Sequence, residues 1–228
     1  MISKKKEFYS GVGLMAAFIV VLIIFFSPVF NGKNGLDYLD NLYNSISKGS
    51  AYYIPDAKEK SMKFKGKAIS ASFAMDNAEQ ASKTALLFTA AGAKVDVKDK
   101  SLKVSGDLGA ILMACLEDAD AMYANKGELL AKKYGYDERQ IMYNWWKAFR
   151  GMGTDFKDNK LFKEADALGL VVKKAVETAY NYYKIEPQKI GDRIWVVIFS
   201  LLFYVIYTVW YGYAIMFMFE GWGLKIGH

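Results

Sequence analysis

The chain has 228 residues, a formal net charge of +6, 53% hydrophobic residues, one cysteine and one histidine. A basic surplus this small does not create the concentrated basic face that nucleic-acid binding needs, so we expect no nucleic-acid partner. One cysteine cannot form an internal disulfide. With one histidine, His228 at the last position, we expect no cofactor, no metal site and no catalytic residues.

The first strong feature is an uncharged apolar run over Gly11–Phe30, preceded by Lys4–Lys6. Twenty residues of helix are long enough to cross about 30 Å of hydrocarbon. The run is longer than the apolar core of a secretory signal, and no small-x-small cleavage site follows it. We therefore expect an uncleaved membrane anchor, with Pro28 ending or bending the helix near the interface.

The next segment begins with helical spacing of apolar residues over 36–46, with Gly49 as a stop. A strand with one buried face is expected within 62–75, where apolar and small polar residues alternate. Asp76 followed by Glu79 predicts the start of a helix that runs to Ala91, with Gly92 as its stop. A hairpin follows over 95–104, and Asp107 starts another helix.

The order β-α-β-β-α resembles part of a split-βαβ arrangement, in which helices cover an antiparallel sheet. The remaining residues of this region look helical, with one apolar face over 141–149 and another over 161–183. Gly151 and Gly153 are interpreted as a turn between these helices. The predicted fold class is thus membrane-anchored α+β, with two transmembrane helices flanking a domain with a small antiparallel sheet and additional helices.

The second apolar run, Ile194–Phe219, is also free of charge. It is long enough to span a bilayer with tilt, and aromatic residues near both ends suit the membrane interfaces. Lys4–Lys6 before the first span predict a cytoplasmic N-terminus, and two spans return the chain to the cytoplasm. The predicted organisation is a cytoplasmic N-terminus at 1–10, transmembrane helices at 11–30 and 194–219, an extracytoplasmic domain at 31–190 and a cytoplasmic C-terminus at 220–228.

Within the second span, polar and aromatic side chains recur with helical spacing along one stripe. Polar groups at bilayer depth usually face protein, because lipid offers them no hydrogen-bond partner. We therefore expect this stripe to be a helix–helix interface and the first span to act mainly as an anchor. The stripe comprises Ser200, Tyr204, Tyr207, Thr208 and Tyr211.

Two further groups of side chains allow both a functional and a structural interpretation. Trp145 and Trp146, with Arg150 one turn later, are a possible ligand or partner surface, although their apolar helix face also suits core packing. The acidic residues Glu117, Asp118 and Asp120 suit a divalent cation in type but not in spacing. On a helix Glu117 and Asp120 face together while Asp118 points elsewhere, so we expect a solvated helix face.

These features predict a protein of the cell inner membrane that is not an enzyme. Only about ten residues are expected on the cytoplasmic side at each end, too few for an output domain. The leading hypothesis is a non-catalytic accessory or assembly subunit that contacts the lipid bilayer and either other integral membrane subunits or further copies of itself as a homo-oligomer. Alternatives are an extracytoplasmic ligand-binding sensor that acts through a membrane partner, and a two-span regulator of polysaccharide chain length.

Overall fold

The computed structural model describes residues 2–224, so His228 and the end of the predicted C-terminal segment lie outside the described residues. The described chain is mostly helical, with one three-stranded antiparallel sheet. It divides into two compact units, one formed by the residues up to Gly49 together with those from Pro187 onward, and the other by Ser50–Glu186. Each unit is described separately below.

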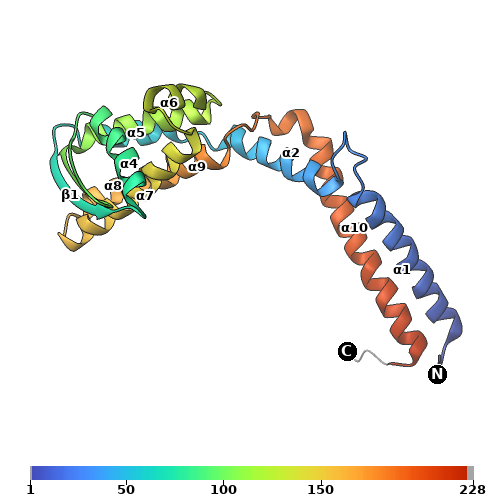
Figure 1. Ribbon diagram of the computed structural model, residues 1–228. Coiled ribbons are helices and arrows are strands. Elements are labelled where there is room, and N and C mark those ends of the chain that lie inside the picture. The colour runs from blue at the N-terminus through green and yellow to red at the C-terminus, as the bar shows by residue number, and fades with distance from the viewer. Residues whose placement is uncertain (1, 225–228) are drawn as a thin grey trace. The chain divides into compact units, whose positions relative to one another are not determined.

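The first unit contains two helices that are long and apolar enough to cross a membrane, α1 (Lys5–Phe26) and α10 (Ile190–Trp222). They lie side by side and antiparallel (Figure 1), so that the backbone N–H of Ser3 donates to the carbonyl of Gly221 at 2.8 Å. Helix α1 ends two residues before Pro28, as expected from the restricted backbone that precedes a proline.

The first unit also contains the amphipathic helix α2 (Gly35–Ser50), which follows α1 after a short turn. Its apolar residues recur at helical spacing, as the sequence predicts, and Leu42 is buried while Leu36 is exposed. The predicted extracytoplasmic domain 31–190 is longer than the second compact unit, because α2 groups with α1 and α10.

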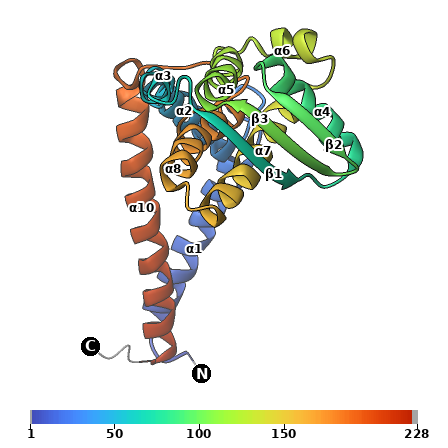
Figure 2. The ribbon, with the colours of Figure 1, turned by 90° about the vertical axis from the view of Figure 1, so that its left-hand side faces the viewer.

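The second unit is built around a sheet with the strand order β1-β3-β2. Strand β3 lies between β1 and β2 and is antiparallel to both, which is the split-βαβ arrangement expected from the element order. In β1 the side chains of Ile69, Ala71 and Phe73 are buried on one face, where α7 packs, and α4 packs on β2 (Figure 2). The strands are β1 (Ala68–Ala74), β2 (Lys94–Lys98) and β3 (Ser101–Asp107).

The helices of the second unit begin at short polar residues in several places. Asp107 accepts a hydrogen bond from Gly109 N–H and starts the predicted helix α5. Helix α4 is capped by Asn77, one residue after the predicted Asp76. The helices are α3 (Ile54–Met62), α4 (Ala78–Ala90), α5 (Leu108–Tyr123), α6 (Gly127–Tyr134), α7 (Glu138–Asp158), α8 (Phe162–Val171) and α9 (Glu177–Asn181), with a π-helical segment, η1 (Val172–Val176), between α8 and α9.

The interpretation of Gly151 and Gly153 as a turn is wrong, because α7 continues through both residues to Asp158. A Cβ atom on Gly151 would lie 2.8 Å from the Cβ of Phe73, whereas Gly153 has open space around it. Gly151 is therefore a contact point between α7 and β1, where the missing side chain lets the helix approach the sheet.

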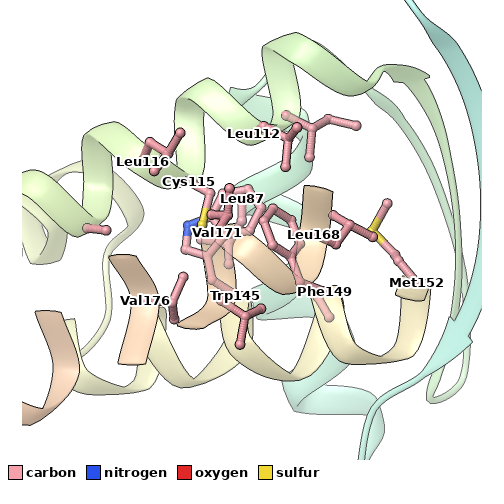
Figure 3. Close-up of a cluster of buried hydrophobic side chains, with 14 of the residues drawn as sticks. Leu87, Leu112, Cys115, Leu116, Trp145, Phe149, Met152, Leu168, Val171 and Val176 are labelled. Atoms are coloured by element: carbon pink, nitrogen blue, oxygen red, sulfur yellow. The ribbon is translucent and has the colours of Figure 1, made fainter. Parts of the chain in front are cut away.

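The core of the second unit lies between the sheet and the helices, and among the helices themselves. Figure 3 shows its centre, where Trp145 and Phe149 from α7 meet Leu112, Cys115 and Leu116 from α5. Trp145 packs edge-on against Phe149 with ring centroids 5.2 Å apart. Burial raises the pKa of the Cys115 thiol, as is typical of a structural rather than a reactive cysteine.

Candidate functional site

The contact between α1 and α10 is made by small residues where the backbones come closest. A Cβ atom on Gly11 would lie 2.8 Å from the carbonyl oxygen of Ala214, and both residues are buried. About one turn after Gly11 on α1, the carbonyl of Leu14 accepts a hydrogen bond from the indole N–H of Trp210 at 3.0 Å. The first span is thus a packing partner of the second, in addition to any role as an anchor.

Part of the predicted stripe faces the interior of the first unit. Ser200 is only 8% exposed and donates a hydrogen bond to the carbonyl of Val197 at 2.8 Å. The Tyr43 hydroxyl from α2 lies 2.6 Å from the Ser200 hydroxyl oxygen, to which it can donate. Tyr207 stacks on Phe18 of α1 with ring centroids 6.1 Å apart. Ser200 and Tyr207 therefore belong to the packing of α1, α2 and α10.

The other part of the stripe lies on the surface of the first unit. Tyr204 is 58% exposed and Tyr211 is 44% exposed. Thr208 is also exposed, and its hydroxyl donates back to the carbonyl of Tyr204 at 2.7 Å. These three residues form what we call the exposed tyrosine face: Tyr204, Thr208 and Tyr211. Tyr211 borders the α1–α10 contact, since its ring lies against Phe18 of α1 with ring centroids 5.3 Å apart, but most of the face stays exposed within the described chain.

The adjacent tryptophans of α7 have different surroundings. Trp145 is fully buried and donates through its indole N–H to Asp118 at 2.9 Å, so it cannot contribute to the surface that the sequence suggested. Trp146, turned about 100° around the helix, is only partly buried. Its indole N–H donates at 2.9 Å to Glu177, the residue that directly follows the π-helical segment.

Trp146 lines an open pocket of about 370 Å³ between α7 and the segment formed by η1 and α9. Tyr143 stacks on Trp146 with ring centroids 5.8 Å apart, and the guanidinium of Arg150 lies 4.7 Å from the centre of the Trp146 ring. The pocket therefore offers aromatic edges and one carboxylate rather than a free stacking face. Its lining is Met142, Tyr143, Trp146, Val176, Glu177, Tyr180 and Asn181.

Asp118 points away from Glu117 and Asp120, as helical spacing predicts, and it is buried. Asp118 is 3% exposed and accepts hydrogen bonds from the Tyr134 hydroxyl at 2.6 Å and the Trp145 indole at 2.9 Å, with Lys133 at 2.9 Å. Burial, together with this carboxylate, raises the pKa of Tyr134. The fully paired Asp118 therefore links α5, α6 and α7 and has a structural role.

Asp120, on the same helix, is engaged at the surface of the unit. It pairs with Lys58 at 2.6 Å and accepts from the Tyr52 hydroxyl at 2.8 Å, which raises the pKa of Tyr52 to about 12. Glu117 is exposed. Among residues 2–224, no group of three or more His, Cys, Asp or Glu side chains is arranged to hold a metal ion.

Several residues of these sites could not be found from sequence patterns. Glu177 lies 31 positions from its partner Trp146, and Tyr43 lies 157 positions from Ser200. Each pair joins separate helices, so no local spacing predicts it. Comparisons with known protein families, curated proteins and solved structures give no match for this chain.

Proposed function

We propose that this chain is a non-catalytic accessory or assembly subunit of a larger complex in the cell inner membrane. In this proposal α10 docks, through the exposed tyrosine face, on another integral membrane subunit or on a second copy of the chain. The observation that carries the proposal is the exposure of Tyr204, Thr208 and Tyr211, which occupy the middle of an apolar helix. Tyr204 is 58% exposed, and Tyr211 stays 44% exposed although its ring also borders Phe18 of α1.

Tyr204 and Tyr211 would each place a hydroxyl group on the lipid-facing side of a spanning helix. A hydroxyl surrounded by hydrocarbon finds no hydrogen-bond partner, whereas a neighbouring helix can supply one together with a broad contact surface. Thr208 already bonds to its own helix at 2.7 Å, so it adds small size rather than an unmet donor. A single interhelical hydrogen bond contributes only about 0.6 kcal/mol, so the face is expected to act as a group.

The membrane orientation belongs to the same proposal. Lys4–Lys6 precede α1, and such basic residues are retained on the cytoplasmic side. The compact unit Ser50–Glu186 then lies outside the cytoplasm and provides a second contact surface for partners.

The test is the simultaneous replacement of Tyr204, Thr208 and Tyr211 by leucine. The variant should insert in the membrane normally, because leucine is at least as apolar as the residues it replaces. We expect the variant to lose its partner, or its own second copy, on extraction into mild detergent. Co-purification measures the loss of a partner, and the protein mass of the particle, after subtraction of bound detergent, measures the loss of a second copy.

The matched control replaces Ile198, Val205 and Val209 by leucine. All three are exposed on another side of α10, so the control changes lipid-facing packing to a similar extent. The proposal predicts that the control retains the partner. If the two triple variants retain or lose it to the same degree, the tyrosine face is not a docking surface.

A second candidate function is ligand binding by the unit Ser50–Glu186, with signalling through a membrane partner. It is favoured by the aromatic pocket beside Trp146, because π-helical segments often occur at functional sites. A small ligand in this pocket should change the fluorescence of Trp146. The change should be absent in Trp146→Phe, while the other four tryptophans keep the folded-state emission.

A further inference from the structure

The first unit contains an apolar pocket of about 320 Å³ that is lined by α1, α2 and α10. It lies where α1 ends and α10 begins, so it occupies one end of the membrane hairpin. The bulky lining residues are hydrocarbon or aromatic, and the only polar groups at its edge are Tyr38 and Ser200. Its apolar lining includes Phe25, Phe30, Leu39, Val196, Phe199 and Phe203.

A second pocket of about 220 Å³ adjoins the first and shares Phe30 and Tyr38 with it. The second pocket is polar where the first is apolar, since two cations line it together with amide and hydroxyl groups. Its polar lining residues are Asn31, Lys33, Asn41, Ser45, Gln188 and Arg193. One continuous surface therefore passes from an apolar hollow to a basic one.

The two cations have no carboxylate partner in the described part of the chain. Arg193 is bonded through Nε to the side-chain carbonyl of Gln188 at 3.1 Å, and this bond orients its guanidinium without neutralising it. Lys33 and Arg193 are both exposed, and neither forms an ion pair within residues 2–224. Asp37 and Asp192 are near in sequence but do not line the pocket.

The depth of the two pockets in a bilayer follows from the helices that form them. Trp195, near the start of α10, is 80% exposed, as expected for a tryptophan at the membrane interface. The amphipathic helix α2 is of the kind that lies in the interface plane. The apolar pocket is then at the level of acyl chains, and the basic pocket is at the level of the head groups.

We propose that these two pockets together bind one anionic phospholipid of the surrounding bilayer. The phosphate lies between Lys33 and Arg193, and an acyl chain lies against Phe25 and Phe203. Charge complementarity selects an anionic lipid over a docked apolar helix, since a helix would leave both cations without a counter-charge. This inference does not rest on the proposed docking of α10, because it uses different residues and requires only that the hairpin cross a bilayer.

The test uses the full chain purified in mild detergent and native mass spectrometry. Phosphatidylglycerol is titrated against phosphatidylcholine with the same acyl chains. Phosphatidylcholine has a phosphate as well, but its choline cation makes the net charge zero, so it lacks the net attraction to the two basic residues. If each of them contributes about fivefold, one phosphatidylglycerol binds about twenty-five-fold more tightly than phosphatidylcholine. The double variant Lys33→Gln with Arg193→Gln should bind the two lipids equally. Both side chains are exposed, so the variant should keep the melting temperature of the parent chain.

The matched control is Lys94→Gln with Lys98→Gln on the exposed strand β2, which removes the same charge elsewhere. The control should keep the preference for phosphatidylglycerol. A third variant, Leu39→Trp, fills the apolar pocket and should weaken the binding of both lipids. The proposal is overturned if the parent chain binds both lipids equally, if the control loses the preference, or if Leu39→Trp binds both lipids as the parent does.

Discussion

The two compact units differ in the side chains at their closest contacts. The proposed function places Ser50–Glu186 in water and the first unit in lipid, so we call them the soluble unit and the membrane unit. The soluble unit buries large residues such as Trp145 and Phe149, and its buried carboxylate Asp118 is paired. In the membrane unit the closest contacts involve Gly11 and Ala214, whereas Phe199 is 68% exposed. The proposed function accounts for this difference by two solvents, since apolar side chains need no burial where the surroundings are lipid.

The comparison also shows what glycine does in each unit. Gly151 lets α7 approach a strand in the soluble unit, and Gly11 lets α1 approach α10 in the membrane unit. Each has a neighbour, Gly153 or Gly13, with open space around it. Each unit therefore contains one glycine at a close contact and, two residues later, one glycine with no neighbour near its Cβ position.

The largest effect is expected from removing the central aromatic residue of the soluble unit. Trp145→Ala creates a cavity at a fully buried position and removes one of the two donors to Oδ2 of Asp118, which keeps the hydrogen bond from Tyr134. The free energy of unfolding should fall by about 3–5 kcal/mol. Chemical denaturation of the full chain in detergent, followed by circular dichroism, measures it.

The control for this prediction is Trp146→Ala on the same helix. Trp146 is only partly buried, so its loss should cost clearly less than that of Trp145. Equal costs for the two variants would show that Trp145 is not at the centre of the core.

The second prediction concerns the tight glycine of α7. Gly151→Ala places a methyl group 2.8 Å from the Cβ of Phe73, and such overpacking should destabilise the domain by about 1–3 kcal/mol. Gly153→Ala should instead stabilise it by up to about 1 kcal/mol, because alanine is the better helix former. Melting temperatures that move in the same direction for both variants would contradict the contact between α7 and β1.

The third prediction concerns Gly11, the glycine of α1 at the close contact with α10. Gly11→Leu should separate α1 from α10, since even a Cβ atom there would lie 2.8 Å from the Ala214 carbonyl oxygen. Gly13→Leu should leave the helices paired. Disulfide cross-linking between cysteines placed at Phe8 and Trp222, whose ring centroids are 5.7 Å apart, measures the pairing in membranes. Equal cross-linking in the two variants would argue against the packed hairpin.

Much of the fold follows from the sequence because its causes are local. The two apolar runs, the alternating strand and the Asp107 cap each depend on residues within a few positions. Gly151 was misinterpreted because its role depends on Phe73, which lies far away in the chain. The burial of Asp118 was not predicted because it depends on Trp145, which is also distant in sequence. A glycine in a helix and an acid beside two others have the same local pattern whether they are exposed or buried.

The candidate sites show the same limit. The stripe on α10 is periodic, so its existence could be predicted, but its division into a packed and an exposed part could not. That division depends on where α1 and α2 contact α10, through Phe18 and Tyr43. The aromatic pocket was foreseen only through Trp146, since its other wall comes from a different helix.

The smallest predicted effect is a pH dependence of the soluble unit. The ion-paired hydrogen bond from Lys67, at 3.0 Å, lowers the pKa of Glu164, whose side chain is 9% exposed. A lowered pKa contributes stability above the unfolded-state value, and this contribution is lost as pH falls below about 4.3. Glu164→Gln should therefore cost up to about 1 kcal/mol at neutral pH and less in acid.

The control for the pH dependence is Glu79→Gln, whose partner Lys83 lies on the same exposed helix face. That pair is solvated, so its loss should change stability little at any pH. A constant difference between Glu164→Gln and the parent chain from pH 7 to pH 3 would contradict the assigned role of Lys67.

The most direct test of the two-solvent account is the side of the membrane on which each unit lies. A membrane-impermeant maleimide is applied to intact cells that carry either Ser3→Cys, before α1, or Lys98→Cys, on an exposed strand. The native thiol of Cys115 is fully buried and gives no background in the folded chain. The account predicts labelling at position 98 in intact cells, and at position 3 only after the membrane is permeabilised. Labelling of both positions in intact cells, or of position 3 alone, would contradict a hairpin that crosses the membrane and holds the soluble unit outside.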